Sequence, residues 1–334
     1  MGPLAASGYA VVALDQRGFG KTKERDRQGG QTITYEDDIS SFRMLNLAAD
    51  IVALVYTLGY TSVAAVIGHD FGSPVAAHCA LIRPDVFRSV VMMSAPFTGP
   101  PAWGTPATVA NAKPLIQQVD KMLAKLDPPR KHYMMYFSSP QANADLMGAP
   151  QGLHRFLRTY YHVKSADWKP NQEVRPLGGF SPAAIASMPY YYIMPRLQTM
   201  PECLALNAPS AEEIQNNTWL PDDELAVYTS QFTATGFQGG LNWYRCQTDS
   251  RWAKDLQVFA GKQIEVPAMF IGGAQDWGVY QIPGAAEAMR TKACKSMEEE
   301  DFVLVDGAGH WVQQEKPEEV VRHLLRFVRK LDVL

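Results

Sequence analysis

The sequence predicts an α/β fold: a mostly parallel sheet with helices on both faces, interrupted by a mainly helical insertion. Short apolar runs alternate with helical apolar patterns over residues 1–96, and the same alternation returns over residues 255–334. Between them, residues 97–254 are dense in proline, methionine and tyrosine and show helical patterns. We therefore expect a core built from residues 1–96 and 255–334 and a lid built from residues 97–254.

The first core segment alternates strands and helices in order. Strands are predicted at the short apolar runs 9–14, 63–67 and 89–93. Apolar residues at helical spacing predict a helix over 42–58, which Gly59 is placed to end, and a second helix runs to about residue 82. In the second core segment, we expect strands at 267–271 and 302–305 and helices at 281–290 and 317–328. Pro317 suits a helix start because its missing N–H is not needed there.

The central stretch is 63–76, VAAVIGHDFGSPVA, where a strand changes to a helix within a few residues. Gly68 and Gly72 flank Asp70, and a sharp turn of this kind forces strained backbone angles and close chain approach. The pattern is that of the nucleophile elbow G-x-S-x-G, with Asp in place of Ser. A carboxylate there can attack carbon without a base, forming an ester that water must cleave. The alternative is an aspartate that only caps the following helix.

Composition places the chain among globular proteins and excludes several function classes. Its 334 residues are 46% hydrophobic and 19% charged, and a net charge of -3 argues against nucleic acid as a partner. No apolar run reaches the roughly 18 residues of a membrane span, and the N-terminus lacks signal-peptide features, so we expect a cytoplasmic protein. Four widely spaced cysteines predict neither a metal site nor a disulfide framework: Cys79, Cys203, Cys246 and Cys294.

Two further residues complete a candidate catalytic group with Asp70. Asp276 follows the strand expected at 267–271, and His310 follows the strand expected at 302–305. The carboxyl ends of parallel strands share one edge of a sheet, so we expect these three side chains to meet there. Each residue also has a structural alternative, as a cap or turn for the aspartates and as a simple hydrogen-bonding group for the histidine.

From about residue 8 to the end, the chain resembles the soluble epoxide hydrolases of the α/β-hydrolase superfamily, in which nucleophile, acid and histidine follow this order. The matching core stretches are 8–20, 68–72 (GHDFG) and 309–311 (GHW). The family's lid carries one tyrosine in a Tyr-Phe pair and another in an Asn-Trp-Tyr-Arg stretch. Matches to these are found at Met135-Tyr136-Phe137 and Leu241-Asn242-Trp243-Tyr244-Arg245.

The resemblance implies an α/β-hydrolase fold and a two-step reaction. Asp70 would open an apolar epoxide to an alkyl ester, with Tyr136 and Tyr244 donating to the epoxide oxygen. His310, oriented by Asp276, would then activate water to release a vicinal diol. The N–H of Phe71 would serve as an oxyanion donor, and no metal or organic cofactor is implied. A lid rich in methionine and aromatic residues suits an apolar substrate.

Two alternatives to an active epoxide hydrolase remain open. A haloalkane-type dehalogenase shares the Asp nucleophile, although that family binds halide with a tryptophan at the position of Phe71. The second alternative is a truncated, inactive hydrolase-like protein. The family has about three strands before the position of Gly8, and the third leads into a His-Gly-x-Pro loop that this sequence lacks. That strand lies between those matching 9–14 and 63–67, so its loss is expected to leave backbone unpaired or to force a new pairing.

Overall fold

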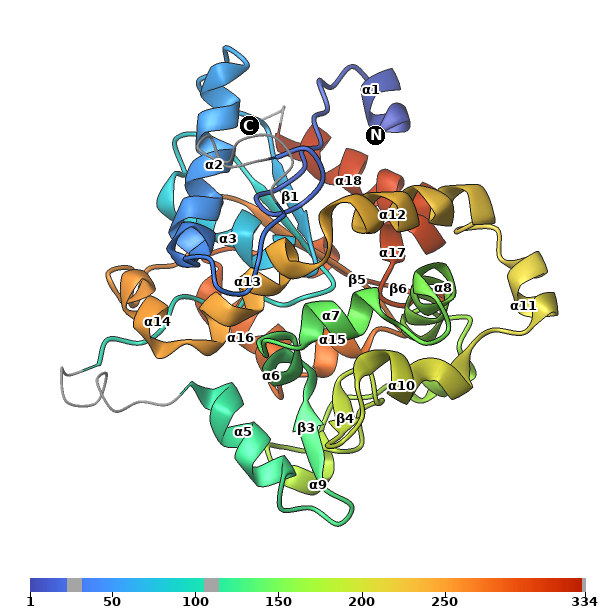
Figure 1. The fold of residues 1–334 in the computed structure, drawn as a ribbon. Coiled ribbons are helices and arrows are strands. Elements are labelled where there is room, and N and C mark those ends of the chain that lie inside the picture. The colour runs from blue at the N-terminus through green and yellow to red at the C-terminus, as the bar shows by residue number, and fades with distance from the viewer. Residues whose placement is uncertain (23–31, 105–113, 332–334) are drawn as a thin grey trace.

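A four-stranded parallel sheet forms the centre of the computed structural model, which describes residues 1–22, 32–104 and 114–331. The strand order is β1-β2-β5-β6, with bounds Val66–His69, Val90–Met93, Ala268–Gly273 and Phe302–Val305. Each of these strands coincides closely with a predicted one, and every neighbouring pair is parallel. Figure 1 shows the sheet between the blue helices α2 and α3 and the red helix α18.

Helices cover both faces of the sheet, as predicted. Val90 and Met92 of β2 pack with residues of α3, whereas Val91 and Met93 pack with residues of α18 on the opposite face. This alternation follows from the two-residue period of a strand. The core helices are α1 (Gly2–Ala6), α2 (Met44–Thr57), α3 (Gly72–Ile82), α15 (Trp277–Tyr280), α16 (Ala285–Ala288), α17 (Val312–Glu315) and α18 (Pro317–Leu331).

The prediction of a buried strand at 9–14 is wrong. This stretch has no regular secondary structure, and its side chains include Val12 and Leu14, which are 56% and 38% exposed. Within the described residues, β1 pairs only with β2 and forms the edge of the sheet, where Ile67 is 42% exposed. No described strand lies beside 9–14 to pair its backbone groups, and apolar composition alone does not make a strand without such a neighbour.

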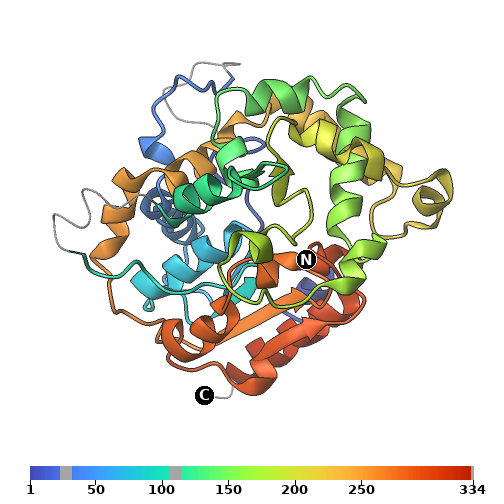
Figure 2. The ribbon, with the colours of Figure 1, turned by 90° about the horizontal axis from the view of Figure 1, so that it is seen from below.

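The insertion between β2 and β5 is mainly helical in its described part; residues 105–113 of the predicted lid lie outside that part. Figure 2 shows its green and yellow ribbon arched beside the blue and red core elements. It also contains an unpredicted antiparallel pair, β3 (Arg130–His132) and β4 (Ile193–Pro195). Its helices are α5 (Leu115–Leu123), α6 (Tyr133–Phe137), α7 (Ala142–Met147), α8 (Leu153–Lys164), α9 (Pro182–Ile185), α10 (Met200–Leu204), α11 (Ala211–Asn216), α12 (Asp222–Thr235), α13 (Gln238–Thr248) and α14 (Ser250–Gln257). None of the described helices combines the length and apolar content that a membrane crossing requires.

The helix α13 is attached to the core through the loop that follows residue 14. A Cβ at Gly239 would lie 2.1 Å from the Gly18 carbonyl oxygen, so the two backbones approach more closely than any side chain allows. The Trp243 indole N–H donates to the Arg17 carbonyl oxygen at 3.0 Å. These contacts fix the part of α13 that carries Tyr244, the neighbour of Trp243 in sequence.

We predict that Gly239→Ala lowers the free energy of unfolding by about 2–3 kcal/mol, because the new methyl group must displace backbone rather than a flexible side chain. Urea unfolding of the purified protein measures this change. Gly178→Ala is the matched control, since a Cβ there meets no atom within 4 Å. Equal stability of the two variants would show that the α13 contact contributes nothing.

Candidate active site

The turn between β1 and α3 holds Asp70 in a strained conformation. Asp70 has a φ of 52°, in the left-handed region that residues with a side chain rarely adopt. Its N–H donates to the Met93 carbonyl oxygen at 3.1 Å, which fixes the turn to β2. A Cβ at Gly68 would lie 1.9 Å from the Gly72 carbonyl oxygen, so the turn needs glycine there. Strain of this kind persists where the surrounding structure holds it, often at functional sites.

Asp70, His310 and Asp276 form one line of contacts at the carboxyl edge of the sheet. His310 Nδ1 lies 3.1 Å from Asp276 Oδ2, and His310 Nε2 lies 2.9 Å from Asp70 Oδ1. The second contact is short but not aligned as a hydrogen bond, so we describe it as an ion pair. Asp276 also accepts the N–H of Gly278 at 2.7 Å, and its side chain and that of His310 are each only 2% exposed. The structure thus brings the three predicted residues together.

The remaining oxygen of Asp70 is bound by the predicted oxyanion donor. The N–H of Phe71 donates to Asp70 Oδ2 at 2.6 Å. One carboxylate oxygen therefore occupies a backbone N–H site, whereas the other faces His310 Nε2. This arrangement suits a carboxylate that attacks with one oxygen. The other oxygen would carry the negative charge when water later adds to the resulting ester.

Opposing electrostatic effects act on Asp70 and His310. Burial disfavours the charged form of Asp70, but the facing His310 and the positive charge of Lys164 outweigh it, so the pKa of Asp70 lies below its ordinary value. Burial and Lys164 lower the pKa of His310. The carboxylates of Asp276 and Asp70 raise it by more, so its net pKa lies above the ordinary 6.5. The attraction between the two side chains therefore favours the carboxylate form of Asp70 and the imidazolium form of His310.

Both the lid and the core hold the loop that carries His310. The backbone N–H of His310 donates to the Lys164 carbonyl oxygen at 2.8 Å, from the end of α8 in the lid. Its carbonyl oxygen accepts Ser94 Oγ–H at 3.0 Å and lies 2.7 Å from His69 Nε2. Burial lowers the pKa of His69 to about 4, so this ring is neutral and donates through Nε2. The position of His310 thus depends on contacts to both domains.

The Glu315 side chain also binds the backbone of the loop that carries His310. Its carboxylate accepts three backbone N–H groups, from Ala166 at 2.8 Å, Gly309 at 2.9 Å and Trp311 at 3.0 Å. Ala166 belongs to the inserted segment, whereas Gly309 and Trp311 flank His310. One side chain therefore joins the lid to the histidine loop.

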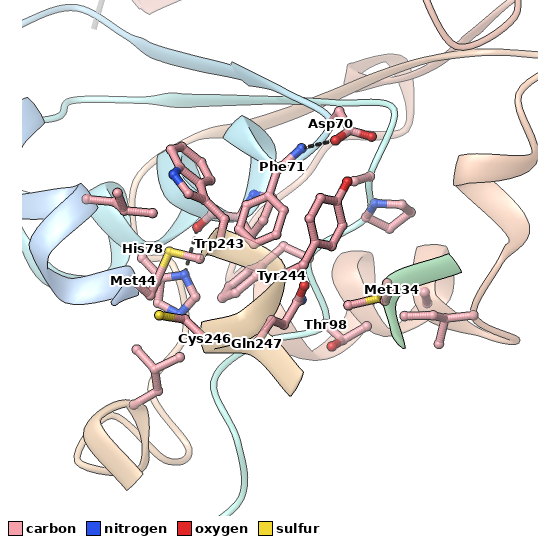
Figure 3. Close-up of a pocket in the computed structure, with 18 of the residues that line it drawn as sticks. Met44, Asp70, Phe71, His78, Thr98, Met134, Trp243, Tyr244, Cys246 and Gln247 are labelled. Atoms are coloured by element: carbon pink, nitrogen blue, oxygen red, sulfur yellow. Dashed lines mark hydrogen bonds between the residues drawn. The ribbon is translucent and has the colours of Figure 1, made fainter. Parts of the chain in front are cut away.

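Asp70 lies where two cavities meet. Their volumes are about 370 Å³ and about 310 Å³, and both are lined by Asp70, Phe71, Trp243 and Tyr244. Figure 3 shows the first cavity, in which the Tyr244 ring lies beside Phe71 and its hydroxyl is directed toward Asp70. The second cavity has a largely apolar wall, which includes Leu146, Phe156, Leu157, Phe232 and Phe237.

Of the two predicted tyrosines, the structure places Tyr244 at the cavities and Tyr136 away from them. Tyr244 lines both cavities, and its ring lies 5.5 Å from that of Phe71 in an edge-to-face arrangement. Tyr136 lines neither cavity: its hydroxyl donates to Asp145 at 3.1 Å, and the Lys131 ammonium lies 4.8 Å from its ring. Polar partners in the lid therefore hold the Tyr136 hydroxyl, and we correct its expected role in the site.

Tyr133, one helical turn earlier on α6, takes the place expected of Tyr136. It lines the first cavity, and its ring lies 5.8 Å from that of Tyr244. Burial and the charge of Asp70 both raise the pKa of Tyr133, so it stays protonated. The segment 133–137, YMMYF, contains both tyrosines, and it is the first of them, not the one that precedes Phe137, that lines the cavity. Sequence reasoning also missed Lys164 and Glu315, which carry no motif and act only through the folded arrangement.

The fold and the site define a hydrolase with a carboxylate at its nucleophile elbow, and comparisons narrow this class to a family. The α/β hydrolase fold family matches residues 1–317. Epoxide hydrolase A of Mycobacterium tuberculosis is 30% identical over 335 residues, which cover 99% of this chain and 85% of that protein. The chain belongs to the epoxide hydrolase family of the α/β-hydrolase superfamily, which confirms the resemblance seen in the sequence.

Solved structures give the same family. An epoxide hydrolase from an endophytic Streptomyces matches with a TM-score of 0.75 and 27% identity, covering 99% of this chain and 84% of that one. Epoxide hydrolase I of potato (Solanum tuberosum) matches with a TM-score of 0.67 and 26% identity, covering 94% and 82%. The similarity therefore extends over nearly the whole chain.

We predict that Glu315→Ala lowers the free energy of unfolding by roughly 2–4 kcal/mol, because three backbone N–H groups lose their acceptor. Urea unfolding tests this against Glu319→Ala. Glu319 is an exposed residue that pairs with Arg322 on the surface of α18, and its loss should change stability by at most about 0.5 kcal/mol. A stability loss no larger than that of the control would contradict the role of Glu315.

Proposed function

We propose that the chain hydrolyses apolar epoxides to vicinal diols through an alkyl ester formed on Asp70. The observation that carries this proposal is the arrangement of the Asp70 carboxylate, with one oxygen bound by the Phe71 N–H and the other facing His310. A carboxylate needs no general base to attack carbon, whereas the resulting ester needs a base-activated water to be cleaved. The epoxide hydrolase family membership supports the same reaction.

In the first step, a carboxylate oxygen of Asp70 forms a bond to one epoxide carbon, and the bond from that carbon to the ring oxygen breaks. The ring oxygen becomes an alkoxide that needs a proton. Tyr133 and Tyr244 line the first cavity beside Asp70, and both are protonated at neutral pH. Their hydroxyl groups can donate hydrogen bonds to the ring oxygen as negative charge develops on it, and one can transfer its proton.

In the second step, water attacks the ester carbonyl carbon of Asp70. His310 takes a proton from this water, and Asp276 holds the imidazole in the required orientation. Negative charge develops on the carbonyl oxygen, which the N–H of Phe71 can stabilise. Collapse of this intermediate breaks the bond between the carbonyl carbon and the alkyl oxygen. His310 returns its proton to the leaving diol oxygen, which leaves Asp70 as a carboxylic acid holding the second water proton. Loss of that proton to solvent restores the Asp70 carboxylate, and the phenol that protonated the ring oxygen takes up a proton in return.

The cavities support an apolar substrate with a substituent on each side of the epoxide ring. Asp70 and Tyr244 lie at the junction, so each cavity can accept one substituent of an epoxide bound between them. Aromatic and aliphatic side chains dominate the second cavity, where apolar groups gain by leaving water.

Among the described residues, no group of three or more His, Cys, Asp or Glu side chains is arranged to bind a metal ion.

We predict that His310→Gln forms the ester but fails to cleave it. Incubation with styrene oxide should add one substrate mass to the peptide containing Asp70, as mass spectrometry of the digested protein can detect. Asp70→Ala should acquire no such mass. His154→Gln, a partly exposed lid histidine, is the matched control and should make diol without accumulating ester.

Two results would contradict this mechanism. A folded His310→Gln protein that releases diol at the wild-type rate would exclude His310 as the base. Wild-type protein that hydrolyses haloalkanes and leaves epoxides unchanged would instead favour the dehalogenase alternative.

We predict that Tyr133→Phe and Tyr244→Phe each slow ester formation by about a hundredfold, because each loses a proton donor to the ring oxygen. Tyr136→Phe should stay within about twofold of wild type, since its hydroxyl is held by Asp145. Rapid-quench kinetics with styrene oxide measure the step directly. A large loss for Tyr136→Phe with none for Tyr133→Phe would reverse our correction.

A further inference from the structure

Lys164 is a buried cation beside the active site that the proposed reaction does not yet use. It ends α8, is 5% exposed, and has no carboxylate partner within 4 Å among the described residues. Its ammonium instead lies over three aromatic rings, 5.4 Å from Tyr160, 5.3 Å from Tyr192 and 5.5 Å from Trp311. Cation–π contacts offset part of the cost of burying an ammonium, but an apolar side chain would avoid that cost entirely.

The position of Lys164 gives its charge an effect on the catalytic residues. Its carbonyl oxygen holds the N–H of His310, and the neighbouring Trp311 ring lies under its ammonium. Tyr160 also lines the second cavity together with Asp70. From this position, the positive charge of Lys164 opposes protonation of both His310 and Asp70. In a buried site, such charge interactions are weakly screened.

The charges at the site balance differently before and after the ester forms. In the free enzyme, the carboxylates of Asp70 and Asp276 balance the ammonium of Lys164 and an imidazolium at His310. Once Asp70 is esterified, its negative charge is gone. Asp276 and Lys164 then balance each other once the imidazolium proton of His310 has passed to solvent, and a proton kept on His310 would leave a buried positive charge without a counterion.

We propose that Lys164 acts on His310 through its positive charge, as a positioning residue. In the ester, this charge disfavours a proton on His310, so the imidazole stays neutral and can serve as the base for hydrolysis. This inference rests on the proposed ester mechanism. Without Lys164, the carboxylate of Asp276 would pair with a protonated His310 in the ester, and that imidazolium cannot accept a proton from water. Loss of Lys164 should therefore affect ester cleavage more than ester formation.

Of the other titratable groups around His310 and Lys164, all but Glu315 are neutral. The His69 ring lies 5.0 Å from that of His310, and it is neutral because burial lowers its pKa to about 4. Burial raises the pKa of Glu315 to about 7, so this group, which faces three backbone N–H donors, changes its charge within the pH range of the test. It does so in every variant, and the pH profiles of the variants are therefore compared with that of wild type. The remaining groups are buried phenols whose pKa is raised by burial, so they stay neutral: Tyr133, Tyr160, Tyr191, Tyr192 and Tyr244.

Single-turnover kinetics test the proposal on the full chain. Wild type, Lys164→Met, Lys164→Arg and Lys169→Met are mixed with styrene oxide, and rapid quench gives the rates of ester formation and decay from pH 6 to 9. Lys164→Met keeps the length of the side chain without its charge, and Lys169 is an exposed lysine nearby. At pH 7 we expect ester decay in Lys164→Met to slow by about tenfold. The decay should recover at higher pH, where His310 loses its proton.

Each outcome bears on the proposal. Lys164→Arg and Lys169→Met should keep the wild-type pH profile of ester decay. A Lys164→Met profile equal to wild type, or slowed by the same factor at every pH, would overturn the proposal, since a structural defect alone does not move a pH profile. The decay of labelled protein does not depend on the fraction that folds, and Lys164→Gln provides a second neutral variant. If neither wild type nor His310→Gln forms any ester, the proposed mechanism fails rather than the role of Lys164.

Discussion

The close placement of two carboxylates and a histidine at one edge of the sheet, with Asp276 and His310 buried and Asp70 partly exposed, is the constraint on which the site depends. Ionisable groups removed from water are costly unless hydrogen bonds and opposite charges compensate. The N–H of Phe71 and the N–H of Gly278 each satisfy a carboxylate oxygen, and His310 lies between Asp70 and Asp276. The strained backbone of Asp70 contributes to this arrangement because it directs the carboxylate toward the histidine loop and brings the next N–H within reach.

The inserted helical segment holds the candidate active site in place through direct contacts with the histidine loop. Its helix α8 supplies the carbonyl oxygen that holds the N–H of His310, and Glu315 binds backbone from the lid and from the histidine loop together. A Cβ at Gly309 would lie 2.6 Å from the Lys164 carbonyl oxygen, so the loop approaches α8 as closely as glycine permits. Motion of α8 would therefore move the base, which couples the arrangement of the lid to the chemistry at Asp70.

The sequence predicts features that follow from topology and misses those that depend on a partner. Asp70, Asp276 and His310 could be predicted to meet because the carboxyl ends of parallel strands share one edge. The run at 9–14 could not be judged in the same way, since a strand needs a neighbour and hydropathy does not provide one. The choice between Tyr133 and Tyr136 required the directions of two side chains on a single turn of helix, and Asp145 decides it by accepting the hydroxyl of Tyr136.

In the proposed mechanism, a single event, the loss of negative charge when Asp70 becomes an ester, changes the acidity of groups on both sides of it. Before the attack, burial and the charge of Asp70 raise the pKa of Tyr133 and Tyr244, which keeps both phenols protonated. As the ester forms, that charge leaves the carboxylate and appears on the epoxide oxygen, so the phenols face an alkoxide instead. The same loss removes one of the carboxylates that raise the pKa of His310. In the proposed reaction, ester formation at Asp70 thus makes the tyrosines better donors at the ring oxygen and favours the neutral form of His310, which can accept a proton in the step that follows.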